Sequence, residues 1–240
     1  MPNKGFRKRL ARAIIIDRAT SENHSIVGCI ARERSEENYR FASNFIAGKT
    51  VLDIGGGKGI GHDLLLARGA KSILSLDRYV AANEYGGDPR VRSIQGDFLA
   101  YPLSDESFDV IICLGTLFYL RDGDGALLKM HRLLRPAGML VINCINQQLI
   151  RRYFGMSLEK VDEKFSAAYD AVGFRAILRK HFNAEPTLYV QQPVPVSGNF
   201  LNALAFWLIP LTWPLCRHPI MLKPPGTEGM YNYAIVSKNR

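Results

Sequence analysis

Cysteine is scarce in this sequence, and its spacing argues against two common kinds of site. No C-x-x-C pair occurs, and the four cysteines are far apart along the 240 residues: Cys29, Cys113, Cys144 and Cys216. This spacing favours neither a zinc site nor a disulfide framework. We therefore predict no metal site and reduced thiols in a cytoplasmic protein.

Long apolar runs are also absent. The uncharged stretch 200–216 contains Pro210 and Pro214, and it is shorter than the roughly 20 residues that a membrane-spanning helix needs. Near the amino terminus the continuously apolar stretch 13–16 is shorter than the apolar core of a secretory leader. We expect neither a transmembrane helix nor a secretory leader.

Acidic residues are outnumbered, and the excess of positive charge is uneven. The formal net charge is +9, and residues 1–18 carry six lysines and arginines against one aspartate. Apolar residues recur there at helical spacing, so a short basic amphipathic helix is one interpretation. Three interpretations stay open for this segment: a solvated tail, contact with anionic lipid at the inner membrane face, and a nucleic-acid contact. Nucleic acid is the weakest of them, because the arm lacks interleaved aromatics and a recognised nucleic-acid-binding fold.

A glycine-rich loop follows an apolar run that ends in Asp53. The glycines fall at every second position: Gly55, Gly57 and Gly59. No phase of this loop fits the dinucleotide pattern G-x-G-x-x-G, and Lys58 is not followed by the serine or threonine of a P-loop. The pattern that fits is D-x-G-x-G-x-G. Because glycine has no Cβ, such a loop lets the backbone lie against a ligand at the carboxyl end of a strand.

Apolar strand patterns alternate with helical patterns through most of the chain, which predicts a parallel sheet with helices on both faces. A helix within 34–48 precedes the first strand, and a helix over 125–134 precedes the fifth. Beyond the fifth strand we predict a helix over 158–172, a strand opening at Gly173–Phe174, and an irregular apolar segment over 182–229. The expected strands are about 50–54, 72–77, 91–94, 108–114, 139–144 and 231–237.

Together these motifs resemble the class I S-adenosylmethionine-dependent methyltransferases, of the type 11 kind. The resemblance covers about residues 37–180 and implies an α/β, Rossmann-like, doubly wound seven-stranded sheet with an apolar insertion before the last strand. It divides the chain into a basic segment, 1–33, and a methyltransferase domain, 34–240, in which 182–229 is a variable lid. The motifs that carry it are the glycine loop, Gln95–Phe98, 102–109, 133–138 and the lead-in 38–41.

The resemblance also implies where S-adenosyl-L-methionine binds. Asp53 and the three loop glycines would approach its methionine part and ribose. Asp77 would accept hydrogen bonds from the ribose hydroxyls, although a turn or helix-capping role stays open. The further residues implied are Arg78 beside Asp77, Asp97 and Phe98 at the adenine, Leu114 and Gly115 after the fourth strand, and Tyr39 and Arg40 near the cofactor carboxylate, where plain packing is the alternative.

The catalytic residues are less defined, because many relatives carry histidines after the fourth strand where this chain has Thr116–Tyr119. If the acceptor is a hydroxyl, a base must take its proton. Tyr119 and Asp122 are the candidates, with a purely structural role as the alternative for each. The chain lacks the Asn-Pro-Pro-Tyr or Asp-Pro-Pro-Tyr motif of amide and adenine nitrogen methylation, and it lacks a cysteine nucleophile motif.

We therefore predict methyl transfer to a hydroxyl of a small molecule. The chain is loosely similar to bacterial enzymes that methylate glycans or lipid-linked precursors, which places a sugar or lipid-linked acceptor ahead of a quinone- or polyketide-like one. RNA methylation and a non-catalytic role as a cofactor-binding partner protein stay open as well. Residues 200–216 could form a substrate lid, a peripheral membrane contact or part of the core.

Overall fold

A computed structural model describes residues 26–79, 87–148, 167–191, 194–195, 220–223, 227–229 and 231–239. Its elements in chain order are α2 (Ile26–Ala42), η2 (Ser43–Phe45), β1 (Thr50–Ile54), α3 (His62–Ala67), β2 (Ser72–Asp77), β3 (Val91–Gln95), β4 (Phe108–Cys113), η3 (Leu117–Tyr119), α4 (Gly123–Leu133), β5 (Leu134–Ile145), α7 (Ala171–Phe182), β6 (Thr187–Gln191), β7 (Val194–Pro195), β8 (Ile220–Leu222), β9 (Thr227–Glu228) and β10 (Tyr231–Ser237). The basic segment 1–18, the stretch 200–216 and most of the expected helix 158–172 lie outside the described residues.

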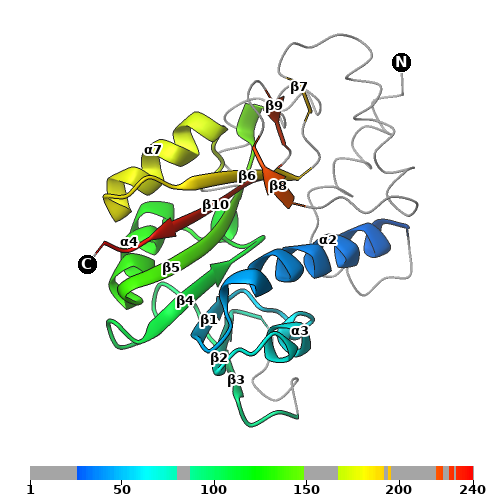
Figure 1. Cartoon of the computed structure of the whole chain (residues 1–240), viewed down its shortest axis with the longest axis vertical. Helices are drawn as coiled ribbons and strands as arrows, with labels where there is room; N and C mark the ends of the chain where they lie inside the picture. Colours follow the sequence, from blue (N-terminus) through cyan, green and yellow to red (C-terminus); the bar gives the residue numbers. More distant parts are fainter. Residues whose placement is uncertain are drawn as a thin grey trace.

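The central sheet has the order β3-β2-β1-β4-β5-β10-β6-β8 (Figure 1). Its first five strands pair in parallel, and β10 is antiparallel to both of its neighbours. This confirms the predicted doubly wound α/β sheet and its first five strands. The sheet has eight strands rather than the predicted seven. The additional edge strand is β8, which pairs with β6 through residues 189–191 and 220–222.

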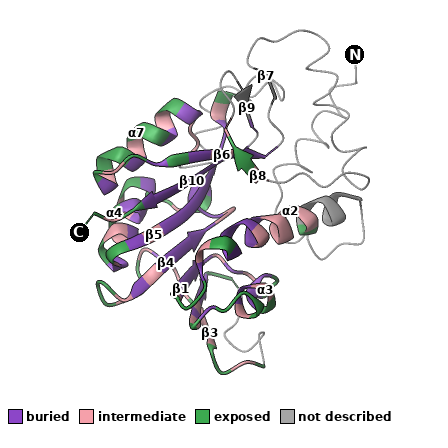
Figure 2. Cartoon of the chain, in the orientation of Figure 1, coloured by how far each residue is buried: buried purple, intermediate pink, exposed green. Residues whose placement is uncertain are grey.

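Helices cover both faces of the sheet, and two apolar cores result. One core packs α4 and α7 against the side chains of one face, and the other packs α2 and α3 against the opposite face. Figure 2 shows the central strands β1, β4, β5 and β10 as mostly buried, whereas the edge strand β8 is exposed. The near-continuous burial of β4, from Phe108 to Cys113, agrees with the prediction that this strand is covered on both sides.

The predicted strand opening at Gly173–Phe174 is wrong, because these residues lie inside α7. The carboxylate of Asp170 caps the amino end of α7 by accepting a hydrogen bond from Gly173 N at 2.7 Å, and Asn183 ends it in the left-handed conformation. The buried residues Phe174 and Leu178, four apart, lie on one helical face. The cap and this spacing outweigh the helix-weakening effect of a glycine in the first turn.

Part of the segment predicted as a lid belongs to the sheet instead. Residues 187–191 form β6, which pairs with β10, and Val190 and Gln191 are buried. Thr187, Tyr189 and Val190 favour strands, so the segment carried a local signal that the prediction did not use, and pairing with β10 completes the strand. Within the described part of the chain, no helix combines the length and the apolar character needed to cross a bilayer.

The side chain of Asp109 connects the start of β1 to β5, and its charge contributes to the stability of the sheet. Its carboxylate accepts a hydrogen bond from Thr50 N at 2.8 Å and pairs with Arg135 at 3.0 Å. Burial alone would raise the pKa of this carboxyl, but the Thr50 amide and the Arg135 guanidinium together lower it below its usual value.

Replacing Asp109 by asparagine is expected to lower the free energy of unfolding by about 1 kcal/mol at pH 7. Because the folded-state pKa is the lower one, this stabilisation is present above the unfolded pKa and is lost as pH falls through the folded pKa. Urea denaturation should therefore show a smaller difference between the two proteins at pH 3 than at pH 7. An equal difference at both pH values would contradict a role for the charge.

Candidate functional site

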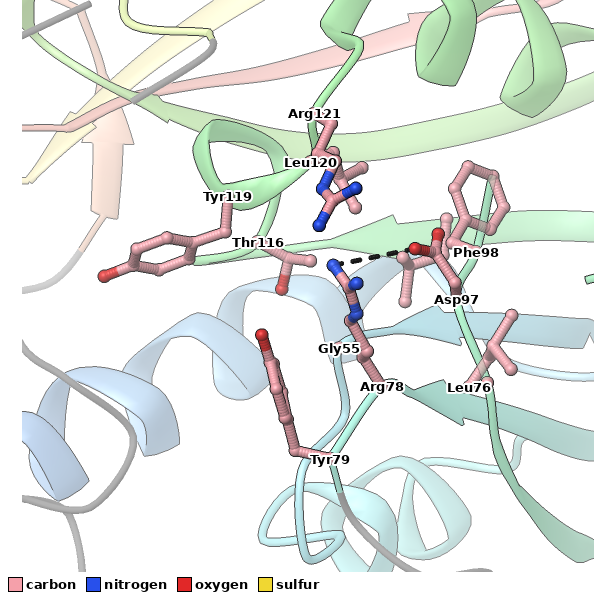
Figure 3. A pocket seen from close by; sticks show the side chains of 12 residues that line it. Gly55, Leu76, Arg78, Tyr79, Asp97, Phe98, Thr116, Tyr119, Leu120 and Arg121 are labelled. Atoms are coloured by element: carbon pink, nitrogen blue, oxygen red, sulfur yellow. Dashed lines mark ion pairs between the residues drawn. The ribbon is translucent and has the colours of Figure 1, made fainter. Parts of the chain in front are cut away.

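A cavity of about 420 Å³ opens at the carboxyl ends of the parallel strands. It lies where the strand order reverses between β1 and β4, which is where open α/β sheets bind ligands. Its volume is in the range of small-molecule sites. The wall is contributed by four segments (Figure 3): Ile54 and Gly55 at the end of β1, Leu76, Arg78 and Tyr79 at the end of β2, Gly96, Asp97 and Phe98 after β3, and Thr116, Tyr119, Leu120 and Arg121 after β4.

Two glycines of the loop are required for different reasons. Both have positive φ values, +77° at Gly55 and +56° at Gly57. A Cβ on Gly55 would meet the side chain of Thr116, so this position holds the loop close to the segment after β4. A Cβ on Gly57 would meet no protein atom within 4 Å. The space beside Gly57 is therefore open to a ligand, which could lie directly against the backbone there.

Asp77 fastens β2 to the glycine loop. Its side chain is buried, and its two oxygens accept hydrogen bonds from Gly57 N at 3.0 Å and from Tyr79 N at 2.9 Å. A carboxylate oxygen can accept more than one hydrogen bond, so a role toward a ligand is compatible with these contacts. The hydrogen bond from Tyr79 N is the turn role that the sequence left open, and the role of Asp77 toward the ribose stays a prediction.

The segment after β3 brings a carboxylate and an aromatic ring to the cavity. Asp97 accepts a hydrogen bond from Leu99 N and pairs with Arg78 across the cavity at 3.6 Å. Figure 3 shows both side chains in the wall with Phe98. The carboxylate suits an exocyclic amine, while the ring and the guanidinium offer flat surfaces to a base.

Lys129, on α4, holds this segment in place. Its ammonium donates to the carbonyls of Phe98 at 2.7 Å and Tyr101 at 2.6 Å, and it lies 5.1 Å from the centre of the Phe98 ring. Partial burial lowers the pKa of Lys129. A cation held by carbonyls fixes the backbone on which Asp97 is carried.

Several predicted residues lie beside the cavity rather than in its wall. Asp53 is buried beneath the loop, where it accepts a hydrogen bond from the Tyr39 hydroxyl at 2.8 Å. Arg40 pairs with Glu37 on its own helix. The carboxylate of Asp122 caps α4 by accepting from Gly125 N at 2.8 Å. Five more predicted residues lie outside the set that lines the cavity: Gly57, Gly59, Asp77, Leu114 and Gly115.

Sequence reasoning missed residues that hold the site from elsewhere in the chain. Asn143 of β5 is buried and accepts a hydrogen bond from Gly115 N at 2.7 Å, which fixes the turn after β4. Thr116 fills the space left by Gly55, and His62 lies against Asp53. Asn143 stands near the end of the predicted fifth strand, and that position is a signal that could have identified it as a site residue. No spacing rule identified Thr116, His62 or Lys129 as site residues.

The fold and the site define a class of protein: a nucleoside-binding, Rossmann-like α/β domain with its ligand cavity at the switch point of the sheet. Residues 52–142 match the family model described as a methyltransferase domain. Over these residues the chain is a methyltransferase domain of the class I S-adenosylmethionine-dependent kind. This confirms the family inferred from the glycine loop and the motifs that follow it.

Curated relatives are similar over the same part of the chain. A tRNA U34 carboxymethyltransferase from Methylococcus capsulatus is 29% identical over 107 residues, which are 42% of this chain and 33% of the relative. A ubiquinone biosynthesis O-methyltransferase from Pseudomonas paraeruginosa is 33% identical over 110 residues, 42% of this chain and 47% of the relative. The matches thus span about half or less of the length of these relatives.

Solved structures are similar in fold over most of the chain. A possible histamine N-methyltransferase from Thermotoga maritima has a TM-score of 0.60 at 17% identity and covers 87% of this chain and 92% of its own. A 1,6-didemethyltoxoflavin-N1-methyltransferase from Burkholderia thailandensis, with bound 1,6-didemethyltoxoflavin and S-adenosylhomocysteine, has a TM-score of 0.56 at 17% identity and covers 98% of this chain and 91% of its own.

The residues present fit S-adenosylmethionine. The open side of Gly57 accommodates close approach of a ligand, and Asp77 can accept from two adjacent ribose hydroxyls. Asp97 and Phe98 offer an acceptor and an apolar ring to adenine. Asp97 and Phe98 thus offer contacts to the cofactor from the cavity wall, and Gly57 and Asp77 offer them from beside it.

Proposed function

We propose that the protein transfers a methyl group from S-adenosylmethionine to a hydroxyl of a small-molecule acceptor. The observation that carries the proposal is one cavity whose wall includes Gly55 of the glycine loop, the Asp97–Phe98 segment and Tyr119. The same cavity has an apolar lining from Ile54, Leu76 and Leu120. A cofactor and an acceptor hydroxyl can thus meet away from bulk water.

The protein's part in this reaction is mainly alignment. The cofactor, when bound, supplies a methyl group already activated by its sulfonium. Asp77 and Asp97 fix the ribose and the adenine, and the glycine loop lets the backbone approach the ligand closely. Orientation of two reactants in this way can lower a barrier by about 7–11 kcal/mol. Tyr119, which lines the cavity, is our candidate to orient the acceptor hydroxyl or to take its proton.

A sugar or lipid-linked acceptor remains our first choice. The basic segment 1–18 and the apolar stretch 200–216 support it, because an acceptor held at a membrane surface would suit both. A quinone-like acceptor is the second candidate, and it is favoured by the similarity to ubiquinone biosynthesis O-methyltransferases. Peripheral contact with the inner membrane face is part of the first proposal.

A panel assay tests the choice of acceptor. Methyl transfer from labelled S-adenosylmethionine is measured with undecaprenyl-linked sugars, with catechol-type quinone precursors and with total RNA. Transfer to the first group alone supports the proposal, and transfer to the quinone precursors alone supports the second candidate. Transfer to RNA alone would overturn both.

Replacing Tyr119 by phenylalanine is expected to lower kcat about 100-fold, as the loss of one proton-transfer group does. The dissociation constant for S-adenosylhomocysteine should stay within about threefold, because the ring that lines the cavity is kept. Steady-state kinetics with the acceptor found in the panel, together with calorimetry, measure both quantities.

Asp122→Ala is the control for the alternative base. Since its carboxylate caps α4, we expect about 1 kcal/mol of lost stability with kcat unchanged. A loss of kcat in Asp122→Ala and none in Tyr119→Phe would reverse the assignment.

A further inference from the structure

Three buried side chains form a closed polar cluster beneath the glycine loop. Asp53 is 1% exposed and His62 is fully buried. The Tyr39 hydroxyl donates to Asp53 Oδ2 at 2.8 Å, and His62 Nε2 lies 3.1 Å from the same oxygen. These residues come from α2, β1 and α3, so the cluster joins three elements that are separate in the sequence.

Both donors converge on one oxygen of the carboxylate. That oxygen is Asp53 Oδ2. With Asp53 ionised, the hydrogen lies on His62 Nε2, because a carboxylate can only accept. Burial and the neighbouring Asp53 carboxylate raise the pKa of Tyr39 well above its usual range, so the phenol stays protonated and donates.

The loop rests directly on this cluster. A Cβ on Gly56 would lie 2.5 Å from Asp53 Oδ2, and a Cβ on Gly61 would meet the ring of Tyr39. The loop therefore follows the shape of the two side chains below it. A rotation of the Asp53 carboxylate would displace Gly56 or leave a void beneath it.

We propose that His62 is a positioning residue for the cofactor. With Tyr39 it holds Oδ2 of Asp53 beneath Gly56, which keeps the glycine loop in its binding shape. Without these donors the buried carboxylate would lose the partners that compensate its burial, and it could rotate under the loop. The inference rests on the cofactor of the proposed function and is independent of the acceptor.

The test compares two replacements of His62 by calorimetry with S-adenosylhomocysteine, which needs no acceptor. His62→Leu removes the donor, and we expect the dissociation constant to rise about tenfold or more. His62→Gln keeps an N–H donor at similar reach, and we expect it to restore affinity to within about threefold of the original protein. Leu65→Ala, in the same helix and fully buried, is the control for a packing defect: it should lower Tm without changing affinity.

Tyr39→Phe provides a second route if His62→Leu does not fold, since it removes only a hydroxyl. It should raise the dissociation constant by a similar factor. Because His62→Gln keeps the donor, the dissociation constant of the double variant Tyr39→Phe/His62→Gln should be within about threefold of that of Tyr39→Phe alone.

Affinity unchanged in both His62→Leu and Tyr39→Phe, with only Tm lowered, would overturn the inference and leave the cluster a purely structural one. Equal losses in His62→Gln and His62→Leu would also overturn it, because the donor would not matter. If the original protein binds S-adenosylhomocysteine but methylates nothing in the acceptor panel, the proposed reaction fails while this inference stands.

Discussion

Replacing Gly57 by valine is expected to abolish measurable binding of S-adenosylhomocysteine while the chain stays folded. The side of this residue toward which a Cβ would point holds no protein atom within 4 Å. The added carbons would therefore occupy space that we assign to the ligand. We expect affinity to fall at least about 1000-fold, which corresponds to roughly 4 kcal/mol.

The substitution also has a backbone cost, which a matched variant measures. Gly48, in the turn before β1, has a φ of +73° and likewise no protein atom within 4 Å of a built Cβ. It lies at the amino end of β1, on the opposite edge of the sheet from the cavity. Gly48→Val should cost about as much stability as Gly57→Val, on the order of 1–2 kcal/mol, without changing affinity. Equal affinity of the two variants for S-adenosylhomocysteine would show that the glycine loop is not part of the binding site.

Removal of the Asp77 carboxylate is expected to have the second largest effect. Asp77→Ala deletes the acceptor for two ribose hydroxyls and the hydrogen bonds to Gly57 N and Tyr79 N. Charge-assisted hydrogen bonds contribute about 1.5–3 kcal/mol each, so the loss of two predicts an affinity reduction on the order of 1000-fold. Calorimetry with S-adenosylhomocysteine measures it directly.

Asp77→Asn separates the two roles of this side chain. The amide keeps an acceptor oxygen for the Gly57 amide but loses the charge, so an intermediate loss of affinity is expected. Asp105→Ala, which removes an exposed carboxylate paired with Arg132, controls for the change in net charge. If Asp77→Asn binds as weakly as Asp77→Ala while both stay folded, the charge matters more than the loop contact.

The parts of the site that the sequence predicted well are those encoded within a few residues. Asp53 and the glycines lie next to each other in the chain, and a strand that ends in a carboxylate is a local pattern. Asp97 and Phe98 also follow directly on a strand. Because parallel strands end at one edge of a sheet, these segments had to meet once the strand order was right.

The parts that sequence reasoning missed depend on contacts between distant residues. Thr116 faces Gly55 across the gap between β1 and β4, and Lys129 reaches the carbonyls of residues about thirty positions earlier. A lysine on a helix looks like a solvated residue until the fold supplies acceptors. Asp122 shows the reverse case, since a carboxylate near the fourth strand serves as a helix cap.

The sequence by itself determined the kind of domain, the doubly wound sheet and the strand ends that meet at the cavity, because periodicity and glycine spacing act over short distances along the chain. Tertiary structure alone decided that β6 joins the sheet, that Gly173 lies in a helix, and that Tyr39 and His62 share one oxygen of Asp53. Hydrogen bonds between elements and close packing set these features, and both depend on neighbours that only folding brings together.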